Sequence, residues 1–515
     1  MKLVVSLKAP TFAELSRTAR EKVRGADLVE LRLDGFPPPR EAELRILIRQ
    51  FTQPVIVTVQ GPEAFGSFQG SDEQRLELLR SAARAGARYV DVDQSLAARL
   101  GALPAGTTRL VSRHVTESTP ADLPALLVDL RLLAGKDDPI KLVTHAASAE
   151  DGLRLLAALA QASGPRIGFC SGEIGRFTRI LCGLHGSEWS YCAPARSAGP
   201  SEPTAPGQFA LDELQAHLPA CGLSAKTSVL GLIGNPARHS WSPRLHSAGL
   251  RRLGADAVYV ACEAFDFERF MTLFALPTYE GFSVTAPFKE QAARLPATPD
   301  EAVMRTRSLN TLARLNGLWH GRNTDVLGAR EALRRAFGRM VTERPLEGLR
   351  ILVLGAGGAA RAVLEAVRGG GGLPLVTARD PAKAAALAQE FGARAIGLEE
   401  VGGIPWDGLV HCTPQGSRAD PGRMPIEPRF LHAGTVVLDA VYRPRETPLV
   451  IAARARGCRA FGGAEWFVLQ AVQQFMLFTG PGLDGKPKFG RQLGESEVET
   501  LFRQTLERLY AEDKA

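Results

Sequence analysis

Short apolar runs alternate with helical patterns along the first half of the chain. The segments between the runs carry apolar residues at three- and four-residue steps and end near Gly, a pattern typical of amphipathic helices. Eight such runs recur at intervals of about 25 residues, and a strand followed by a helix eight times predicts a (β/α)8 TIM barrel. An open doubly wound sheet is the alternative that counting leaves open. The runs cover 3–7, 28–34, 54–60, 89–93, 109–114, 140–146, 165–172 and 189–194.

The second half of the chain restarts with a strand at 229–236 and a mixed α/β segment that extends to about residue 325. Residues 351–380 then read as a strand, a glycine turn, a helix, a glycine-rich stop and a second strand. This order is typical of the first βαβ unit of a dinucleotide-binding domain. Two closing helices are expected at 465–479 and 495–511.

Composition narrows the class of protein. Hydrophobic residues make up 45% and charged residues 23% of the 515 residues, as in soluble globular proteins. No stretch approaches the roughly 20 apolar residues of a membrane span, and the N-terminus lacks the pattern of a signal peptide. The seven cysteines form no CxxC pair and no Cys/His metal spacing, so we expect a cytoplasmic protein with no metal site.

The net charge of +7 lies entirely in the second half, because residues 1–217 carry 25 basic and 25 acidic side chains. A modest basic excess suits an anionic ligand such as a phosphorylated cofactor. No basic run with interleaved aromatic residues is present, so nucleic-acid binding is the weaker interpretation.

The glycine turn at 355–360 fits G-x-G-x-x-G/A, with the apolar strand before it and the helix after it that this motif requires. Small residues let the backbone approach a pyrophosphate at the helix N-terminus. At the end of the second strand Arg379, with Lys383 beyond, is placed to pair with a 2′-phosphate, so NADP is favoured over NAD. Asp380 is expected to cap the next helix. The cofactor-binding candidates are Gly355, Gly357, Gly358, Ala359, Arg379 and Lys383.

Four ordered blocks in the second half resemble shikimate dehydrogenase over nearly all of residues 228–495. They are 234–243 (GNPARHSWSP), 283–289 (SVTAPFK, with Ser283 where Asn is usual), 309–312 (LNTL) and 323–325 (NTD). The resemblance implies a substrate-binding domain at 228–328 plus 460–515 and a Rossmann-type NADP-binding domain at 329–459. It also implies substrate contacts from Ser240, Ser242, Thr285, Asn310 and Gln470.

The chemistry of that reaction needs two further groups. Reduction of a ketone requires a hydride from nicotinamide and a proton for the developing alkoxide. A lysine close to a carboxylate can supply the proton and hold the oxygen, so Lys289 and Asp325 are the expected catalytic pair.

The first half, residues 1–217, resembles type I 3-dehydroquinate dehydratase. The matching segments are 30–34 (ELRLD), 112–114 (SRH), 139–142 (PIKL), 172–179 and 204–208 (TAPGQ). The resemblance implies that Lys141 forms an imine with the keto substrate and that Arg179 binds the substrate carboxylate. Glu30, Arg32, Thr204 and Gln208 are the further substrate-binding candidates.

Elementary chemistry agrees with these roles. Burial in an apolar barrel favours the neutral, nucleophilic form of a lysine amine, which can attack a ketone. The iminium withdraws electrons from the neighbouring carbon, where His114 can remove a proton and later return one to the departing hydroxyl. The reaction needs neither metal nor cofactor.

The barrel also departs from the family pattern. The third strand ends in Gln60 where the family has Arg, and 64–66 (AFG) replace E-G-G, with Glu63 near the expected carboxylate. The sequence therefore leaves open whether the carboxylate that orients the histidine is present.

Together the two halves predict a bifunctional enzyme that dehydrates 3-dehydroquinate and then reduces 3-dehydroshikimate to shikimate with NADPH. Its partners are expected to be these small molecules, without nucleic acid or membrane, and a homodimer is the assembly to test. One alternative is an active dehydrogenase joined to a non-catalytic barrel, and another is an NAD-linked quinate/shikimate dehydrogenase. A sensor of quinate-like acids without enzyme activity fits poorly with the dinucleotide motif and the Lys/Asp pair.

Overall fold

The computed structural model describes residues 1–199, 203–274, 278–315, 317–481 and 487–513. The chain divides into two compact units. The first contains residues 1–229, 237–239 and 256–278, and the second contains 230–236, 240–255 and 279–515. Among the described residues, no helix has both the length and the apolar character that a membrane span needs.

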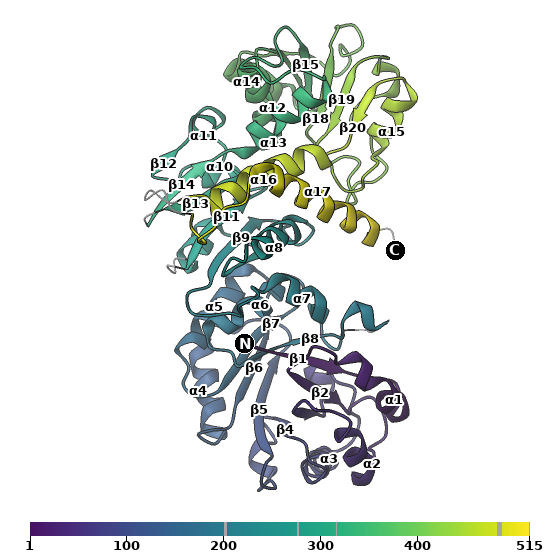
Figure 1. The fold of residues 1–515 in the computed structure, drawn as a ribbon, viewed down its shortest axis with the longest axis vertical. Helices are drawn as coiled ribbons and strands as arrows, with labels where there is room; N and C mark the ends of the chain where they lie inside the picture. The colour runs from purple at the N-terminus through teal and green to yellow at the C-terminus, as the bar shows by residue number, and fades with distance from the viewer. Residues whose placement is uncertain (200–202, 275–277, 316, 482–486, 514–515) are drawn as a thin grey trace. The chain divides into compact units, whose positions relative to one another are not determined.

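Eight parallel strands form the sheet of the first unit, drawn in purple to blue in Figure 1. Their spatial order is β7-β6-β5-β4-β3-β2-β1-β8, and β1 pairs with β8 in parallel register from Lys2–Trp189 to Val5–Cys192. This sequential order excludes the doubly wound alternative and confirms the predicted, nearly closed barrel. The strands are β1 (Lys2–Leu7), β2 (Leu28–Arg32), β3 (Val55–Thr58), β4 (Tyr89–Asp93), β5 (Thr108–Val115), β6 (Ile140–His145), β7 (Arg166–Ser171) and β8 (Trp189–Cys192).

The helices of the barrel depart from the predicted regularity at one place. After β4 the chain forms only a 3-10 helix at Ala97–Arg99, because Gly101 and Pro104 interrupt the segment before it can extend. The prediction of a helix after every strand is therefore wrong there. The α-helices are α1 (Phe12–Lys22), α2 (Glu41–Ile48), α3 (Asp72–Arg84), α4 (Leu123–Leu133), α5 (Ala149–Gln161), α6 (Thr178–Leu181) and α7 (Leu211–His217).

A mixed six-stranded sheet follows, with the order β10-β9-β11-β13-β14-β12. Strand β13 runs antiparallel to both of its neighbours, β11 and β14. The strands are β9 (Ser228–Gly234), β10 (Ala257–Glu263), β11 (Tyr279–Val284), β12 (Thr298–Pro299), β13 (Thr311–Leu315) and β14 (Leu318–Arg322). The helices of this segment are α8 (Ser242–Leu253), α9 (Phe267–Leu273), α10 (Lys289–Ala292), α11 (Glu301–Thr306) and α12 (Thr324–Ala336).

The third sheet is parallel throughout, with the order β17-β16-β15-β18-β19-β20. The order reverses between β15 and β18, so the loops that follow these two strands meet at the topological switch point where α/β sheets bind ligands. The elements are β15 (Arg350–Leu354), α13 (Gly358–Gly369), β16 (Leu373–Thr377), α14 (Pro381–Phe391), β17 (Arg394–Ala395), β18 (Gly408–His411), β19 (Val436–Asp439), α15 (Pro448–Ala455) and β20 (Arg459–Phe461).

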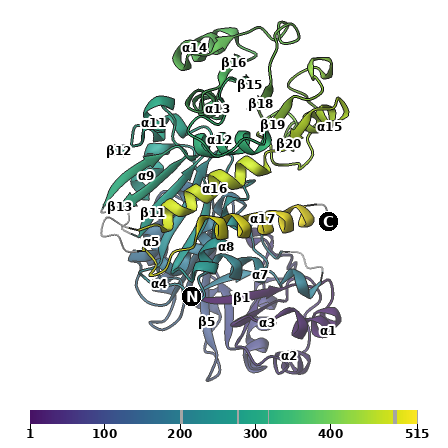
Figure 2. The same ribbon diagram turned by 45° about the horizontal axis from the view of Figure 1, so that its top comes forward.

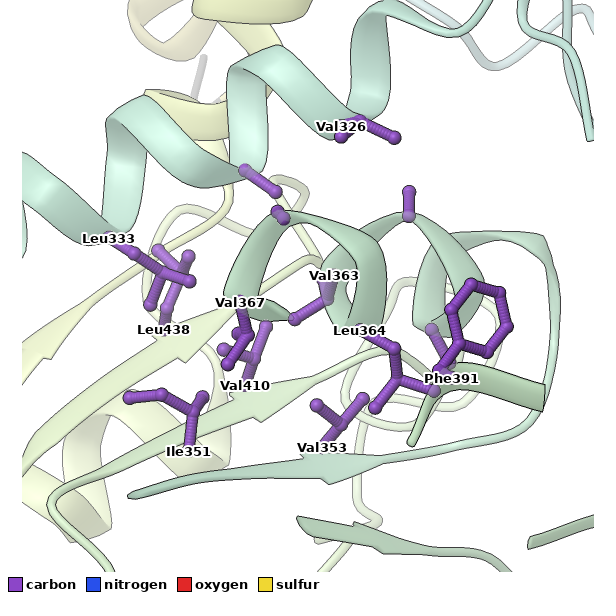
Figure 3. Close-up of a cluster of buried hydrophobic side chains, with 14 of the residues drawn as sticks. Val326, Leu333, Ile351, Val353, Val363, Leu364, Val367, Phe391, Val410 and Leu438 are labelled. Carbon is purple, nitrogen blue, oxygen red and sulfur yellow. The ribbon is translucent and has the colours of Figure 1, made fainter. Parts of the chain in front are cut away.

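Helix α13 is the centre of a buried apolar cluster in the second unit. Figure 3 shows its Val363, Leu364 and Val367 between helix α12 and the strands that carry Ile351 and Val410. Burial of aliphatic side chains stabilises the fold by about 1.5–3 kcal/mol each. The cluster therefore fixes the glycine turn before α13 relative to α12.

Helix α16 (Ala464–Thr479) follows the third sheet in the chain but packs on α12, which precedes that sheet. Figures 1 and 2 both show α16, in yellow, lying beside α12. Helix α17 (Glu495–Glu512) packs on α16 and α8. The closing helices expected from the sequence are thus both present.

Candidate active sites

The first site lies at the carboxyl-terminal ends of the barrel strands. A cavity there is lined by all seven barrel residues singled out from the sequence: Glu30, Arg32, His114, Lys141, Arg179, Thr204 and Gln208. Gln60, Ala64, Phe65, Val143, Phe169, Tyr191 and Ala205 complete its wall. Its volume is about 40 Å³, so it is the smallest of the three cavities that hold candidate residues.

Lys141 is paired inside the barrel, although it has the apolar surroundings expected from the sequence. Its ammonium on β6 donates a hydrogen bond to Asp91 on β4, and both side chains are buried. The Tyr191 ring lies 4.8 Å from the lysine nitrogen. Burial alone would raise the pKa of Asp91, but Lys141 and then His114 outweigh it and hold that pKa below its usual value. Asp91 is thus held as a carboxylate in direct contact with the amine.

His114 lies beside this pair, on β5. Its Nε2 is 3.2 Å from the amide nitrogen of Gln60, and its buried Nδ1 has no hydrogen-bond partner among the described residues. Burial and then the charge of Lys141 lower the pKa of His114 to about 3, with Asp91 opposing the shift. The imidazole is therefore neutral at ordinary pH and able to accept a proton.

Arg179 supplies a buried positive charge at the same cavity. Its side chain is 1% exposed, and its guanidinium donates to the carbonyl oxygens of Tyr191 (3.3 Å) and Pro206 (3.4 Å). Burial lowers its pKa to about 10. No carboxylate forms a salt bridge with it in the part of the chain that the structure describes. A buried cation without an anion is costly, so this end of the cavity favours an anionic ligand.

A polar network holds the remaining barrel candidates. Glu30 accepts hydrogen bonds from Ser6 and from Thr58 (2.8 Å). Thr204 donates to Ser6 at 2.8 Å, and its backbone N–H donates to Gln208 at 2.8 Å. Arg32 forms a buried two-point pair with Asp34, with N–O distances of 2.7 and 3.1 Å. Tertiary hydrogen bonds thus orient these groups before any ligand arrives.

Glu63, whose position the sequence left open, lies in the loop after β3. Its carboxylate pairs with Arg75 at 3.0 Å, and its side chain is 59% exposed. It does not line the cavity, and the residue of this loop that contacts His114 is Gln60. Ala64 and Phe65 cover the cavity instead, with Phe65 in the left-handed region at φ 61° and its carbonyl oxygen accepting from Arg32.

The second site is a cavity of about 230 Å³ in the second unit. It is lined by the seven residues expected to bind substrate or react: Ser240, Ser242, Thr285, Lys289, Asn310, Asp325 and Gln470. They come from the start of α8 and the loop before it, the ends of β11 and β13, and helices α10, α12 and α16. The rest of the wall consists of Leu232, Ser283, Val284, Ala359, Ala440, Tyr442, Trp466, Phe467 and Gln474.

The expected catalytic pair is formed. Lys289, the first residue of α10, donates to the Asp325 carboxylate at 2.5 Å. Their side chains are 19% and 12% exposed, so water screens the pair weakly. The Trp466 indole fixes the first turn of α12 by donating to the Asp325 carbonyl at 3.0 Å. A Cβ on Gly358 would lie 3.3 Å from the Lys289 side chain, so the glycine turn directly approaches the pair.

Asn310 and Gln474 organise the substrate wall. The Asn310 carboxamide accepts from the Thr324 N–H at 2.8 Å and donates to Gln470 at 3.4 Å. Gln474 accepts from Ser283 at 2.7 Å and donates to the Asn310 carbonyl at 3.0 Å. The Gln474 side chain is long enough to reach the short side chain of Ser283.

Sequence reasoning missed several lining residues. In the barrel, Asp91 pairs with Lys141 and Tyr191 lines the cavity. Tyr442 and Gln474 line the second cavity. A signal existed for Gln474, which follows Gln470 by four residues on one helix face. A weaker one existed for Asp91, an acid inside an apolar strand. Tyr442 lies in a loop that carries no such pattern.

The third cavity, of about 710 Å³, lies at the switch point of the parallel sheet. It contains Gly355, Gly357, Arg379 and Lys383, all expected there. Gly355 has φ 129°, and a Cβ at Gly357 would meet no atom within 4 Å, so the turn leaves open space for a ligand. Gly358 begins α13, Ala359 lines the neighbouring second cavity, and Asp380 caps α14 through the Ala382 and Lys383 N–H groups, as predicted.

The electrostatics of this cavity fit a phosphorylated dinucleotide. Arg379 and Lys383 form no salt bridge with a carboxylate among the described residues. A glycine turn at a helix N-terminus presents free N–H groups to a pyrophosphate, and two cations at the next strand end suit a ribose phosphate. The residues present therefore fit NADP.

A buried polar chain supports the opposite wall of the third cavity, where Cys412 and Thr413 follow β18. Thr447 donates to Asp439 at 2.6 Å, and Asp439 lies 2.9 Å from His411 Nδ1. His411 Nε2 is 2.5 Å from the Thr413 hydroxyl. Because His411 and Asp439 are fully buried, this chain fixes the loop that faces the glycine turn.

Comparison with known proteins covers both units. Residues 3–224 match the type I 3-dehydroquinase family, and residues 232–312 match the shikimate dehydrogenase substrate binding domain. Shikimate dehydrogenases (NADP(+)) of Syntrophobacter fumaroxidans and Pyrococcus abyssi are 36% and 34% identical to the chain. The first alignment covers 48% of this chain and 86% of the relative, and the second 55% and 98%.

One relative spans both halves. The chloroplastic bifunctional 3-dehydroquinate dehydratase/shikimate dehydrogenase of Arabidopsis thaliana is 30% identical over an alignment of 497 positions, and the match covers 92% of this chain and 81% of the relative. The order of the two matched segments is the order of the barrel and the dehydrogenase-like sheets in this chain. The chain therefore belongs to the family of bifunctional 3-dehydroquinate dehydratase/shikimate dehydrogenases, with NADP as the cofactor of its dehydrogenase.

Proposed function

We propose that Lys141 is the imine-forming residue of the dehydratase and that Lys289 and Asp325 are the reacting pair of the dehydrogenase. One observation carries both assignments: each unit holds a lysine bonded to a carboxylate inside a cavity lined by the residues that the sequence singled out. We assign the other lining residues to substrate binding from their charge and their position.

In the barrel, the Lys141 amine adds to the substrate ketone once it has lost its proton, with Asp91 holding the lysine in place. Loss of water from the adduct gives an iminium, which acidifies the neighbouring carbon. His114 removes a proton from that carbon and delivers it to the departing hydroxyl, which leaves as water. Hydrolysis of the iminium then releases the product and restores the amine. Arg179 binds the substrate carboxylate, with Glu30, Arg32, Thr204 and Gln208 holding the ring hydroxyls.

In the second unit, Lys289 holds the ketone oxygen of 3-dehydroshikimate and donates the proton that turns the developing alkoxide into a hydroxyl. Asp325 keeps the lysine in place. Bound NADPH supplies the hydride. Ser240 and Ser242 face the substrate carboxylate, and Thr285, Asn310 and Gln470 face its hydroxyls. We assign residues 228–328 plus 460–515 to substrate binding and 329–459 to the nucleotide.

In the cofactor cavity, Arg379 and Lys383 hold the 2′-phosphate, and Gly355, Gly357, Gly358 and Ala359 leave the backbone open to the pyrophosphate. We further propose a reducing, cytoplasmic location, since all seven cysteines are unpaired thiols. The structure contains one chain, so the homodimer stays a prediction from the sequence.

The test is a single incubation of the full chain with 3-dehydroquinate and NADPH. Loss of nicotinamide absorbance with formation of shikimate is the expected result. Borohydride added with 3-dehydroquinate should attach the reduced substrate to Lys141, as peptide mass analysis would show. Consumption of NADPH only when 3-dehydroshikimate is supplied, without trapping at Lys141, would make the barrel a non-catalytic domain.

The second candidate, a non-catalytic barrel, draws on one observation: position 60 carries Gln where the resemblance leads one to expect an arginine. The NAD-linked alternative is tested by comparing NAD and NADP in shikimate oxidation. A preference for NAD would contradict the role given to Arg379.

A further inference from the structure

The partner of His114 in this barrel is a neutral amide. Gln60 follows β3, is 5% exposed, and brings its carboxamide to within 3.2 Å of His114 Nε2. The acid of the same loop, Glu63, faces outward and is bonded to Arg75. Among the residues that the structure describes, the histidine thus has no carboxylate partner of the kind that a general base commonly has.

The four charged groups that shift the pKa of His114, which are Lys141, Asp91, Arg32 and Arg75, are each bonded to another residue in the described structure. Asp91 on β4 accepts from Lys141 on β6, Arg32 on β2 is held by Asp34, and Arg75 on α3 is held by Glu63. These pairs leave Gln60 as the side chain that contacts the ring nitrogen. The orientation of the imidazole therefore depends on position 60.

The Gln60–His114 contact has two hydrogen-bonded states, because half a turn of the amide exchanges its nitrogen and its oxygen. In the first, which is the placement in the structure, the amide N–H donates to Nε2, and the ring proton sits on Nδ1. Both ring nitrogens are then occupied, and no lone pair is left to accept a proton. In the second, the amide oxygen accepts from Nε2–H, and the lone pair of Nδ1 is free.

Nδ1 is the atom that has no partner among the described residues, although it is buried beside a cavity that His114 lines. A buried acceptor without a donor is tolerated where a ligand completes the site. We propose that Gln60 is the positioning residue of the dehydratase: after a half turn of its amide, the oxygen holds His114 as the Nε2–H tautomer in the reacting state, with Nδ1 as the basic atom. This inference rests on the proposed role of His114 as the base.

A neutral partner has a consequence that a carboxylate would not have. An amide cannot stabilise the imidazolium by charge, so burial and Lys141 keep the ring neutral down to low pH. A carboxylate at position 60 would lie within hydrogen-bond reach and favour the protonated ring, because opposite charges at that distance raise a base's pKa by about 1–3 units.

The first experiment compares Gln60→Glu and Gln60→Met with the unchanged chain in dehydration of 3-dehydroquinate between pH 4.5 and pH 8. We expect kcat/KM of the unchanged protein to show no acid limb from His114 in this range. Gln60→Glu should introduce one, with activity falling toward the acidic end. Gln60→Met, which has similar length but makes no such bond, should lower kcat by about tenfold or more without adding a limb.

The second experiment reads the tautomer directly. Long-range proton–nitrogen NMR of histidine-labelled protein, with the His114 signals assigned from a His114→Asn sample, should show the proton on Nε2. A proton on Nδ1 would overturn the proposal. So would a Gln60→Glu profile that matches the unchanged protein in shape.

Two controls separate this inference from the proposed function. NADPH-dependent reduction of 3-dehydroshikimate by the same variants should be unchanged, which reports an intact second unit. Borohydride trapping at Lys141 should persist in Gln60→Met, which reports an intact barrel. If the unchanged protein itself fails to trap substrate, the dehydratase assignment fails. If it traps and dehydrates while Gln60→Met keeps full kcat, only the role of Gln60 fails.

Discussion

Replacement of Asp325 by Asn tests whether Lys289 depends on its carboxylate partner. The change keeps the shape of the side chain and removes its charge, so the 2.5 Å bond to the ammonium weakens. A hydrogen bond between charged groups contributes about 1.5–3 kcal/mol, and each 1.36 kcal/mol is tenfold in rate. We therefore expect the kcat for 3-dehydroshikimate reduction to fall about 10- to 150-fold.

The companion variant, Lys289→Ala, removes the proton donor itself, and its loss should cost about 100- to 10,000-fold. Because Asp325 acts through Lys289, adding Asp325→Asn to Lys289→Ala should cause little further loss. The assay is NADPH oxidation at saturating 3-dehydroshikimate. The same preparations should dehydrate 3-dehydroquinate at an unchanged rate, since that reaction occurs in the other unit. Multiplication of the two single losses in the double variant would refute the reasoning and give Asp325 an independent role.

Three further predictions concern the other cavities. Arg379→Ala should weaken NADP binding about 10- to 150-fold in calorimetry and leave NAD binding nearly unchanged, and equal weakening of both would contradict a phosphate contact. Arg179→Met, similar in volume, should raise the KM for 3-dehydroquinate by at least about tenfold with the reductase unaffected; an unchanged KM would place the carboxylate elsewhere. Asp439→Ala should lower the unfolding free energy in urea by about 1–3 kcal/mol for each buried partner left unpaired, and Glu427→Ala, whose side chain is 62% exposed, is the control.

Local patterning predicts the strands of the barrel closely. The run at 89–93 is β4 without a shift of boundary, and the run at 140–146 differs from β6 by one residue. Apolar strands enclosed by helices read as nearly continuous runs, so the period and the spacing identify them. No α-helix forms after β4, because Gly101 and Pro104 interrupt the segment. The regular spacing of the strands had suggested a helix there.

Contacts between distant strands were harder to predict from the sequence. The pair of Lys289 and Asp325 could be expected, because both residues belong to recognisable blocks. The pair of Lys141 and Asp91 could not, because β4 and β6 are separated by β5 and only barrel curvature turns both side chains inward. The sequence could likewise show that Gln60 departs from a pattern, but the contact with His114 depends on tertiary packing across 54 positions.

The position of helix α16 bears on how the chain matures during translation. Residues 464–479 complete the substrate cavity through Trp466 and Gln470, yet they are synthesised after every strand of the nucleotide-binding sheet. Domains fold as units while the chain emerges from the ribosome. A nascent chain released at about residue 461 would therefore have a complete parallel sheet for the dinucleotide, but α12 would expose the apolar face that α16 covers. Premature termination there gives a species prone to aggregation that lacks one wall of the substrate cavity.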